Sequence, residues 1–338
     1  LTHMGEFEMM KKTTSALAIA ALLGTGAASA ATFQIDDSTS FSVSGALHYT
    51  YKTETDNGGT DTNVIDDGGS SVTFSGSHNA DNGLTTFFAA TFDGIDGTTA
   101  GGDTADGFTN TDEAHIGVAG DFGSVKFGSE SAVYDSIGDV NDVMYEGGIT
   151  STASSDRSQV LQYSSPSLGN VSFDLEAVLN GDDDASNGTD DNDLSLAASV
   201  ALALGGVDLT FAYDQNKAEG EVAQEEGEAY GFSVATSLQG IDLTAAYQAQ
   251  SHDNPKDEVS IVSLGANYGY GAGNVYGVVQ SVGFDETPTG ESDDTFTEYL
   301  LGVDYAVAGN LNVYAEMQSL GRDDDDGDGY FLGAVLKF

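Results

Sequence analysis

The chain has 338 residues, contains no cysteine and carries 55 Asp and Glu against 9 Lys and Arg, which gives a formal net charge of -46. Nucleic-acid binding requires clusters of basic residues, so this charge balance excludes nucleic acid as a partner. The cysteine count excludes disulfides and thiolate metal sites. The length fits either two ordinary domains or one large β domain.

The N-terminus has the three parts of a secretory signal peptide. A basic start at 10–12 is followed by a short apolar run at 16–26 and by the tripeptide ASA, a small-x-small cleavage pattern that ends at Ala30. The apolar run is shorter than the roughly 20 residues that a membrane-spanning helix needs. We therefore predict a signal peptide over 10–30, with cleavage between Ala30 and Ala31.

The remaining sequence divides into a short leading segment and one long domain. Residues 1–9 precede the basic start and are interpreted as an upstream extension or an expression remnant. The mature protein is predicted to be a single domain over 31–338. No later stretch approaches the 18 consecutive apolar residues of a membrane-spanning helix, so a secreted protein of this kind is either soluble or a membrane β-barrel.

From residue 40 onward the sequence alternates apolar and polar residues, as half-buried β-strands do. In FSVSGALHYTYK at 41–52, Phe, Val, Gly, Leu and Tyr share one face, while Ser, Ala, His, Thr and Lys share the other. Short turns rich in Gly and Asn alternate with long, acidic, Gly-rich connections. The pattern predicts sixteen strands, over about 40–52, 70–80, 84–93, 111–120, 124–128, 157–165, 171–180, 193–204, 207–217, 228–238, 241–250, 258–270, 274–284, 294–307, 311–321 and 329–338.

An even strand count, with short turns at one end and long loops at the other, is typical of an antiparallel outer-membrane β-barrel. A barrel of about 16 strands encloses a water-filled lumen. The pattern alone leaves a β-sandwich and a β-solenoid open, although sixteen strands is large for a sandwich and no fixed repeat period is visible. Tyrosines near the strand ends on the apolar faces resemble the aromatic belts of membrane proteins and favour the barrel.

Three segments, taken in order, resemble the sixteen-stranded, trimeric general porins of Gram-negative outer membranes, particularly those of α-proteobacteria. They are FSVSGALHYTY at 41–51, HIGVAGDFGSVKFGSESA at 115–132 and GYFLGAVLKF at 329–338. The resemblance implies an outer-membrane homotrimer surrounded by lipid, in which the third long loop folds inward and narrows the pore. It also implies that the terminal Phe338 is a signal for the barrel-insertion machinery.

The longest connection between predicted strands, about 129–156, is therefore the expected constriction loop. Its acids are separated by four, three and four residues, which places them on one face of a short helix. These acids are Asp135, Asp139, Asp142 and Glu146. The resemblance sets them opposite a basic wall, and the sequence offers as candidates Lys52, Lys126, Arg157 and Lys337. Facing charges of opposite sign would create a transverse field across the pore.

Further acids fall at inferred lumen positions of the predicted strands. They are Asp174, Glu176, Asp208, Asp214, Asp242, Glu298, Asp304 and Glu316. A negatively lined, water-filled pore concentrates cations and repels anions. We expect a cation-preferring channel for ions and small hydrophilic solutes. Adaptation to high salt would explain the same excess of charge and is compatible with this function.

The acidic segment at 323–329 suggests a weak Ca²⁺ site with Asp324, Asp326 and Asp328 as ligands. A full EF-hand loop would place Glu at its twelfth position, where this chain has Val335. No other cofactor is expected. The histidines show no metal-ligand spacing in the sequence, and no enzymatic activity is expected. The alternative to a porin is a non-conducting surface barrel or adhesin whose acidic loops bind divalent cations.

Overall fold

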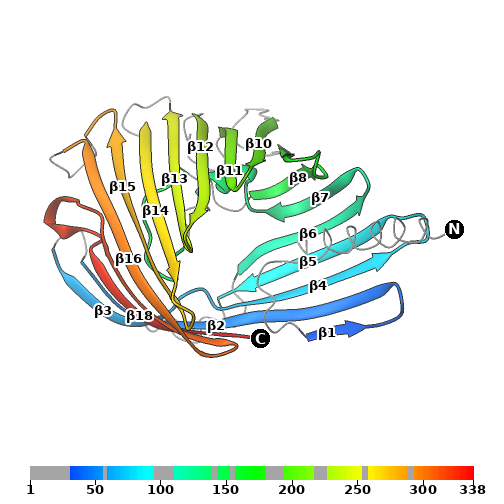
Figure 1. Cartoon of the computed structure of the whole chain (residues 1–338), viewed down its shortest axis with the longest axis horizontal. Helices are drawn as coiled ribbons and strands as arrows, with labels where there is room; N and C mark the ends of the chain where they lie inside the picture. The colour runs from blue at the N-terminus through cyan, green and yellow to red at the C-terminus, as the bar shows by residue number, and fades with distance from the viewer. Residues whose placement is uncertain are drawn as a thin grey trace, which may run out of the picture.

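The computed structural model describes residues 31–55, 59–94, 110–138, 143–152, 157–179, 194–216, 227–252, 258–287 and 293–338. The predicted signal peptide lies outside these ranges. Within them the chain forms one antiparallel β-barrel (Figure 1). Its strands are β1 (Ala31–Gln34), β2 (Thr39–Thr55), β3 (Asp61–Asp67), β4 (Ser71–Asn79), β5 (Thr85–Asp93), β6 (Asn110–Gly120), β7 (Gly123–Glu130), β8 (Arg157–Ser164), β9 (Val171–Leu179), β10 (Leu194–Leu204), β11 (Val207–Asn216), β12 (Gly227–Leu238), β13 (Ile241–His252), β14 (Val259–Gly269), β15 (Asn274–Phe284), β16 (Thr295–Ala308), β17 (Leu311–Ser319) and β18 (Gly329–Lys337).

The barrel closes because β18 pairs with β2, while β9 pairs with β10. The wall therefore has sixteen strand positions, which confirms the predicted count. The additional strand β3 pairs with the 49–55 half of β2, whereas β4 pairs with the 39–46 half. The sequence predicts a loop at this position, because DTNVIDD lacks apolar alternation. The strand forms because β2 runs beyond its predicted end and offers an edge to pair with.

The strands β1 and β18 pair with successive parts of the same edge of β2. Ala31 is opposite Val43, and the backbone of Phe338 exchanges two hydrogen bonds of 2.8 and 2.9 Å with Gly45. The strand β1 and the end of β18 therefore together fill one strand position of the barrel wall. Gly45 is required here, because a Cβ atom would clash with the backbone oxygen of Ser71 and would lie 2.7 Å from Cζ of Phe338.

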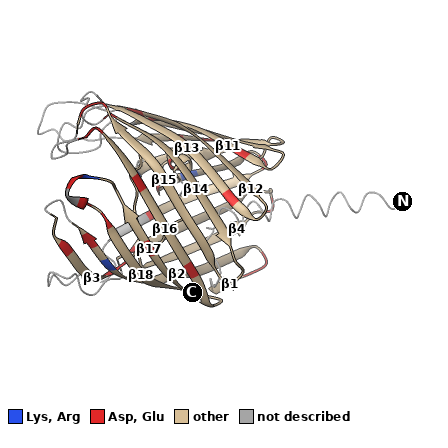
Figure 2. Cartoon of the chain, turned by 60° about the vertical axis from the view of Figure 1, so that its left-hand side comes forward, with Lys and Arg blue, Asp and Glu red and all other residues tan. Residues whose placement is uncertain are grey.

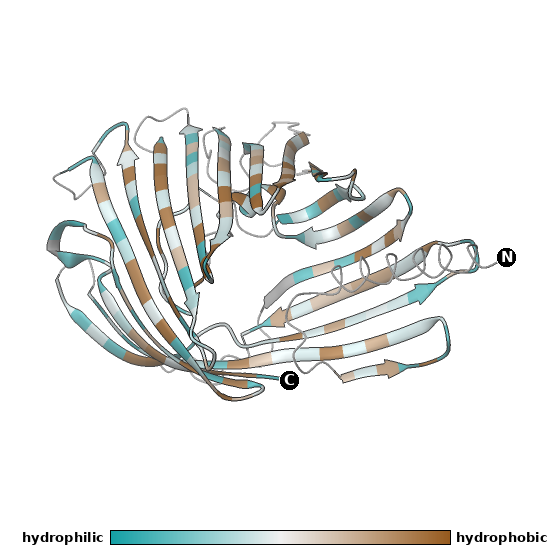
Figure 3. Cartoon of the chain, viewed as in Figure 1, coloured by the Kyte–Doolittle hydropathy of each residue, from teal (hydrophilic) through white to brown (hydrophobic). Residues whose placement is uncertain are grey.

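Hydrophobic and more polar residues alternate along many strands, seen in Figure 3 as brown bands between white and teal ones. On β2, Leu47 and Tyr49 are exposed at the outer surface, whereas His48 and Thr50 are buried inside the barrel. Cross-strand partners share a face, so the rings of Phe211 and its neighbour on β12 lie 6.3 Å apart on the outside. The apolar outer surface matches the lipid-facing band of an outer-membrane barrel.

The third long connection enters the barrel and carries the 3-10 helix η1 (Val133–Ile137). Tyr134 and Ile137 of η1 are fully buried against three alanines on the inner faces of β11 to β13: Ala212, Ala229 and Ala246. Three residues per turn place positions i and i+3 on the same side of a 3-10 helix. A second 3-10 helix, η3 (Asp323–Asp325), lies in the last long loop. No helix among the described residues is long and apolar enough to cross a membrane.

A short helix in an inward-folded loop was predicted and is confirmed. The helix has five residues and contains only Asp135 of the four regularly spaced acids. Glu146 lies beyond the helix, at a bend in an irregular segment, while Asp139 and Asp142 fall outside the described residues. The burial of Tyr134 and Ile137, rather than the spacing of the acids, orients the helix.

Candidate functional site: the constriction loop and the wall that holds it

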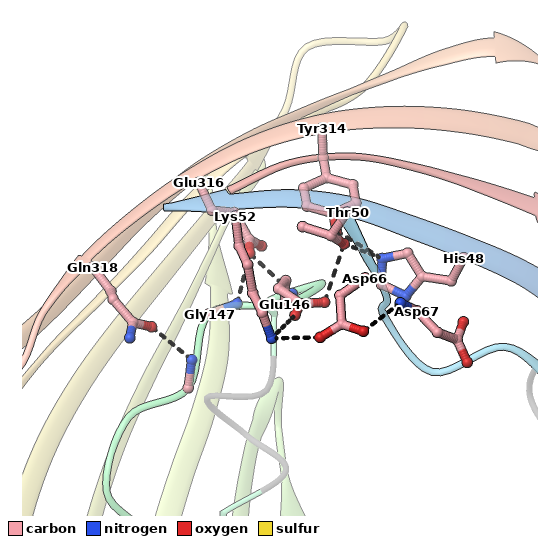
Figure 4. Close-up of polar contacts among 11 residues, drawn as sticks. His48, Thr50, Lys52, Asp66, Asp67, Glu146, Gly147, Tyr314, Glu316 and Gln318 are labelled. Carbon is pink, nitrogen blue, oxygen red and sulfur yellow. Dashed lines mark hydrogen bonds and ion pairs between the residues drawn. The ribbon is translucent and has the colours of Figure 1, made fainter. Parts of the chain in front are cut away.

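The second half of the constriction loop is bound to the wall by a carboxylate. Glu316 of β17 accepts the backbone N–H groups of Tyr145, Glu146 and Gly147 at 2.6, 3.0 and 2.9 Å (Figure 4). It also accepts the hydroxyl of Tyr276 at 2.7 Å. Consecutive backbone N–H groups form a concave site for an anion, and hydrogen bonds to a charged acceptor are stronger than neutral ones. Four donors thus satisfy a carboxylate that is almost completely buried.

The same pattern continues along the loop towards β13. Glu298 accepts the backbone N–H of Thr150 at 2.7 Å and its hydroxyl at 2.6 Å. Gln280 donates to Glu298 at 2.7 Å and to the Thr150 carbonyl at 2.8 Å. Gln248 accepts the hydroxyl of Thr152 at 2.9 Å. Strands β13, β15, β16 and β17 therefore all contribute side chains that hold the loop against the wall.

The first half of the loop is fixed by a buried ion-pair network. Glu176 accepts the backbone N–H of Val133 at 3.1 Å and Nη1 of Arg157 at 2.9 Å. Arg157 also pairs closely with Asp214. Gln162 donates to Glu176 at 2.9 Å. Buried charges must be paired and hydrogen-bonded to be tolerated, and this network meets that condition beneath η1.

Two tyrosines link the halves of the loop to each other and to the wall. The hydroxyl of Tyr134 in η1 is 2.9 Å from Oγ1 of Thr152. Burial raises the pKa of Tyr134 to about 12, so this hydroxyl keeps its proton. The ring of Tyr145 stacks on Tyr314 of β17, with centroids 4.5 Å apart and an interplanar angle of 8°. The hydroxyl of Tyr314 lies 2.7 Å from Nε2 of His48.

The loop also contacts β2 through a small charged cluster (Figure 4). Nζ of Lys52 lies 3.0 Å from Oδ2 of Asp66 and 3.9 Å from Oε1 of Glu146. Thr50 donates its hydroxyl to Glu146 at 3.1 Å. Burial raises the pKa of Glu146; the Thr50 hydrogen bond and Lys52 oppose this rise, whereas Asp66 and Glu316 add to it.

Most of the acids predicted at lumen positions are covered rather than open to pore water. Those buried beneath the loop or against other wall side chains are Glu176, Asp214, Glu298, Asp304 and Glu316. Asp304 accepts hydrogen bonds from the backbone N–H of Asn274 at 3.2 Å and from its side-chain amide at 2.9 Å. Asp174 is half-buried, while Asp208 and Asp242 are exposed near the short turns. Asp135 in η1 is half-buried.

The basic candidates do not form one patch. Lys52, Lys126 and Arg157 each contact at least one carboxylate. Lys337 lies at the short-turn end of β18, six residues beyond the partner of Lys52, or roughly 20 Å along the strand. Figure 2 shows few basic segments among many acidic ones.

The predicted Ca²⁺ segment lies around η3. Asp326 is 3.9 Å from Arg322, and Asp328 accepts the backbone N–H of Leu320 at 3.0 Å. The side chain of Asp324 is outside the described part of the chain. Among the described residues, the group with metal-ligand spacing lies elsewhere, on β6 and β7.

Sequence analysis did not identify several residues that hold the loop. Among them are Tyr134, Tyr145, Thr150, Gln248, Gln280, Tyr314 and Gln318. The strand residues of this set fall at inward positions of the alternating pattern, so the inward direction of their side chains could be predicted. Their partners were not, because alternation says nothing about which loop atoms cover a wall position.

A closed sixteen-stranded barrel with an apolar outside, a polar interior and an inward-folded loop defines an outer-membrane channel protein. The family model for Gram-negative porins matches residues 13–327. The chain therefore belongs to the Gram-negative porin family, as the sequence predicted: it is a non-enzymatic channel of the outer membrane.

Two relatives from Halomonas support this assignment. A "Monosaccharide porin" of Halomonas sp. and a "Major outer membrane protein" of Halomonas elongata are each 29% identical to this chain over 373 residues. The alignments cover 97% of this chain and 100% of each relative. Among solved structures, an anion-selective porin from Comamonas acidovorans superposes with a TM-score of 0.70 at 14% identity, covering 89% of this chain and 100% of that one. That likeness concerns the fold alone.

Proposed function

We propose that this porin passes small hydrophilic solutes and ions by passive diffusion, with the constriction loop setting the size cut-off. The observation that carries the proposal is the binding of three consecutive loop N–H groups by Glu316, inside the barrel. A loop held by hydrogen bonds along the wall reduces the open cross-section by a fixed amount. A loop without such contacts would not define a reproducible limit on solute size.

We further propose that the channel prefers cations. The net charge of -46 gives the pore and its entrances a negative potential. The basic wall residues Lys52, Lys126 and Arg157 contact carboxylates, which largely cancel their fields. Lumen acids such as Asp208 and Asp242 are exposed at the water surface. Salt screens these fields over about 8–10 Å, so the preference should weaken as ionic strength rises.

The solute range of the proposal includes small uncharged sugars. One relative of similar length is named a monosaccharide porin, and we extend that solute class to this chain as part of the proposal. The wall offers hydroxyl and amide groups at inward positions, which suit hydrated and hydroxylated solutes equally.

Weak Ca²⁺ binding by Asp324, Asp326 and Asp328 is a secondary part of the proposal.

We propose a homotrimer whose subunits meet through the outer surface of β2 to β7. This surface has an apolar hollow of about 630 Å³, lined by Phe41, Phe88, Ile116 and Phe127 among others. Large exposed apolar patches rimmed by polar residues mark sites of contact with other proteins or with membrane. Phe338 is proposed as the insertion signal; its ring lies on the outside of the barrel at the short-turn end.

Planar-bilayer recording of the refolded protein tests these proposals. Discrete conductance steps are expected, with a reversal potential in a salt gradient that indicates cation preference. Neutralising the exposed acids Asp208 and Asp242 should reduce cation preference. Neutralising the loop acids Asp135, Asp139, Asp142 and Glu146 should mainly change conductance. Absence of steps would favour the alternative of a non-conducting surface barrel, and anion preference would overturn the selectivity proposal.

A further inference from the structure

A buried histidine lies between two glutamates on the lumen side of β6 and β7. Potential ligand atoms of Glu113, His115 and Glu130 all lie within 4.8 Å of one another. The register brings them together: His115 is opposite Gly128, and Ala114 is opposite Ser129, so Glu113 and Glu130 follow on the same inner face. We propose that these three side chains form a binding site for a divalent transition metal such as Zn²⁺ or Co²⁺.

The imidazole of His115 supplies a second, independent observation. His115 is 8% exposed; its Nε2 makes no hydrogen bond within the described structure, while its Nδ1 pairs closely with Oε1 of Glu130. A buried polar atom without a partner is costly, so each one in a native protein calls for an explanation. A metal ion bound by the imidazole and the carboxylates would supply such an atom with a partner.

The donor set indicates the class of metal. One imidazole nitrogen and two carboxylates suit Zn²⁺, Co²⁺ or Ni²⁺, and three protein ligands leave a position for water. Ca²⁺ and Mg²⁺ favour sites made of oxygen alone. Ser131 donates its hydroxyl to Oε1 of Glu113 at 3.0 Å, which orients that carboxylate. Gly128, opposite the imidazole, places no side chain over it.

Lys126 limits the affinity of this site. Its ammonium is in close contact with Oε2 of Glu130, so a metal ion must share that carboxylate with a cation already present. The group therefore favours reversible binding of metal from the pore water. Glu130 is also the last residue of β7, directly before the constriction loop. Metal binding would thus add positive charge to the wall where the loop begins. This site is additional to the diffusion function, and its test does not depend on conductance.

The experiment titrates the refolded full chain with Zn²⁺ by calorimetry and with Co²⁺ by visible absorption. An excess of Mg²⁺ occupies the exposed acidic loops. One site per protomer is expected. Bound Co²⁺ should show visible d–d absorption bands that indicate nitrogen coordination. His115→Gln should weaken binding by roughly tenfold or more. His78→Gln, on the outer surface beside Thr39, is the matched control and should leave binding unchanged.

Lys126→Met keeps the test decisive if His115→Gln folds poorly. Removing the competing ammonium should tighten Zn²⁺ binding, and a gain of affinity cannot result from misfolding. Heat-modifiable migration in gels reports on barrel formation for every variant. Full displacement of Zn²⁺ by Mg²⁺ would overturn the proposal. Equal affinities in the wild type and a correctly folded His115→Gln variant would overturn it as well.

Discussion

Lys52 of β2 and Glu146 of the constriction loop are in direct contact, with Nζ 3.9 Å from Oε1. The resemblance to porins implied that residues of these two kinds face each other across the opening. A contact at this distance places both charges on the same side of the lumen. Their mutual field therefore joins the loop to β2 and does not span the open channel. Selectivity must depend on the charges that remain at the water surface.

Replacing Lys52 with Met should increase cation preference. Asp66 and Glu146 would lose their shared cation and add uncompensated negative charge to the pore wall. The pair is partly exposed, so the loss of loop attachment should be about 1 kcal/mol or less. Reversal potentials in a salt gradient measure the effect. Lys337→Met removes the same charge at the short-turn end and should have a smaller effect; an equal shift in both variants would contradict the prediction.

Glu146 should make the stability of the protein depend on pH in a defined direction. Because burial raises its pKa, the folded protein binds this proton more tightly than the unfolded chain does. The stabilising contribution is then fully present below the unfolded pKa and is lost as pH rises through the folded pKa. Glu146→Gln stays neutral at every pH, so its advantage in thermal midpoint over the wild type should grow with pH across that window. Glu54→Gln is the charge control. A constant difference would contradict this assignment.

Glu316→Gln should release the middle of the constriction loop. The amide offers one acceptor oxygen and brings its own N–H groups towards the donors of Tyr145, Glu146 and Gly147. Hydrogen bonds to a charged acceptor contribute about 1.5–3 kcal/mol each, so detachment of this segment is expected. Single-channel conductance should rise and become noisier. Asp208→Asn removes an exposed lumen charge that holds no loop and should leave the noise unchanged.

The fold was largely predictable because alternation determines strand faces, and turn residues mark strand ends. His48, Thr50 and Lys52 were placed inward on β2, and the structure has them there. The strand β3 was missed because its sequence carries too few apolar residues to show a period. The strand β3 forms because it pairs with the free edge of β2, and such pairing cannot be read from its own sequence.

The candidate site was predictable in direction but not in detail. Alternation indicated that Glu298 and Glu316 point into the barrel, yet not that loop backbone would cover them. That coverage depends on how a long loop without strand periodicity settles on the wall. The group of Glu113, His115 and Glu130 shows the same limit, because Glu130 is far from the other two in sequence and joins them only through strand pairing.

Gly231→Ala should displace η1 from the wall. A Cβ atom at this position would lie 2.8 Å from the backbone oxygen of Tyr247 and 3.0 Å from Cγ2 of Ile137. The backbone oxygen belongs to a paired strand and has little freedom, so the added methyl group is pushed towards Ile137, which can make room only if the helix moves. Higher conductance and faster proteolysis of the loop are expected. Gly283→Ala meets nothing closer than 3.5 Å and is the matched control. Equal behaviour of the two variants would show that η1 tolerates the added methyl group.

The mature chain is predicted to begin at Ala31. Ala31 is opposite Val43 and Phe338 is bonded to Gly45, so the two residues lie about 7 Å apart along one line beside β2. Mass spectrometry of protein from outer membranes should give a chain beginning ATFQ. Ala30→Arg should block cleavage and reduce barrel assembly, whereas Ser29→Thr, at the tolerant middle position of the pattern, should do neither. A mature chain that begins at another residue would contradict the predicted cleavage between Ala30 and Ala31.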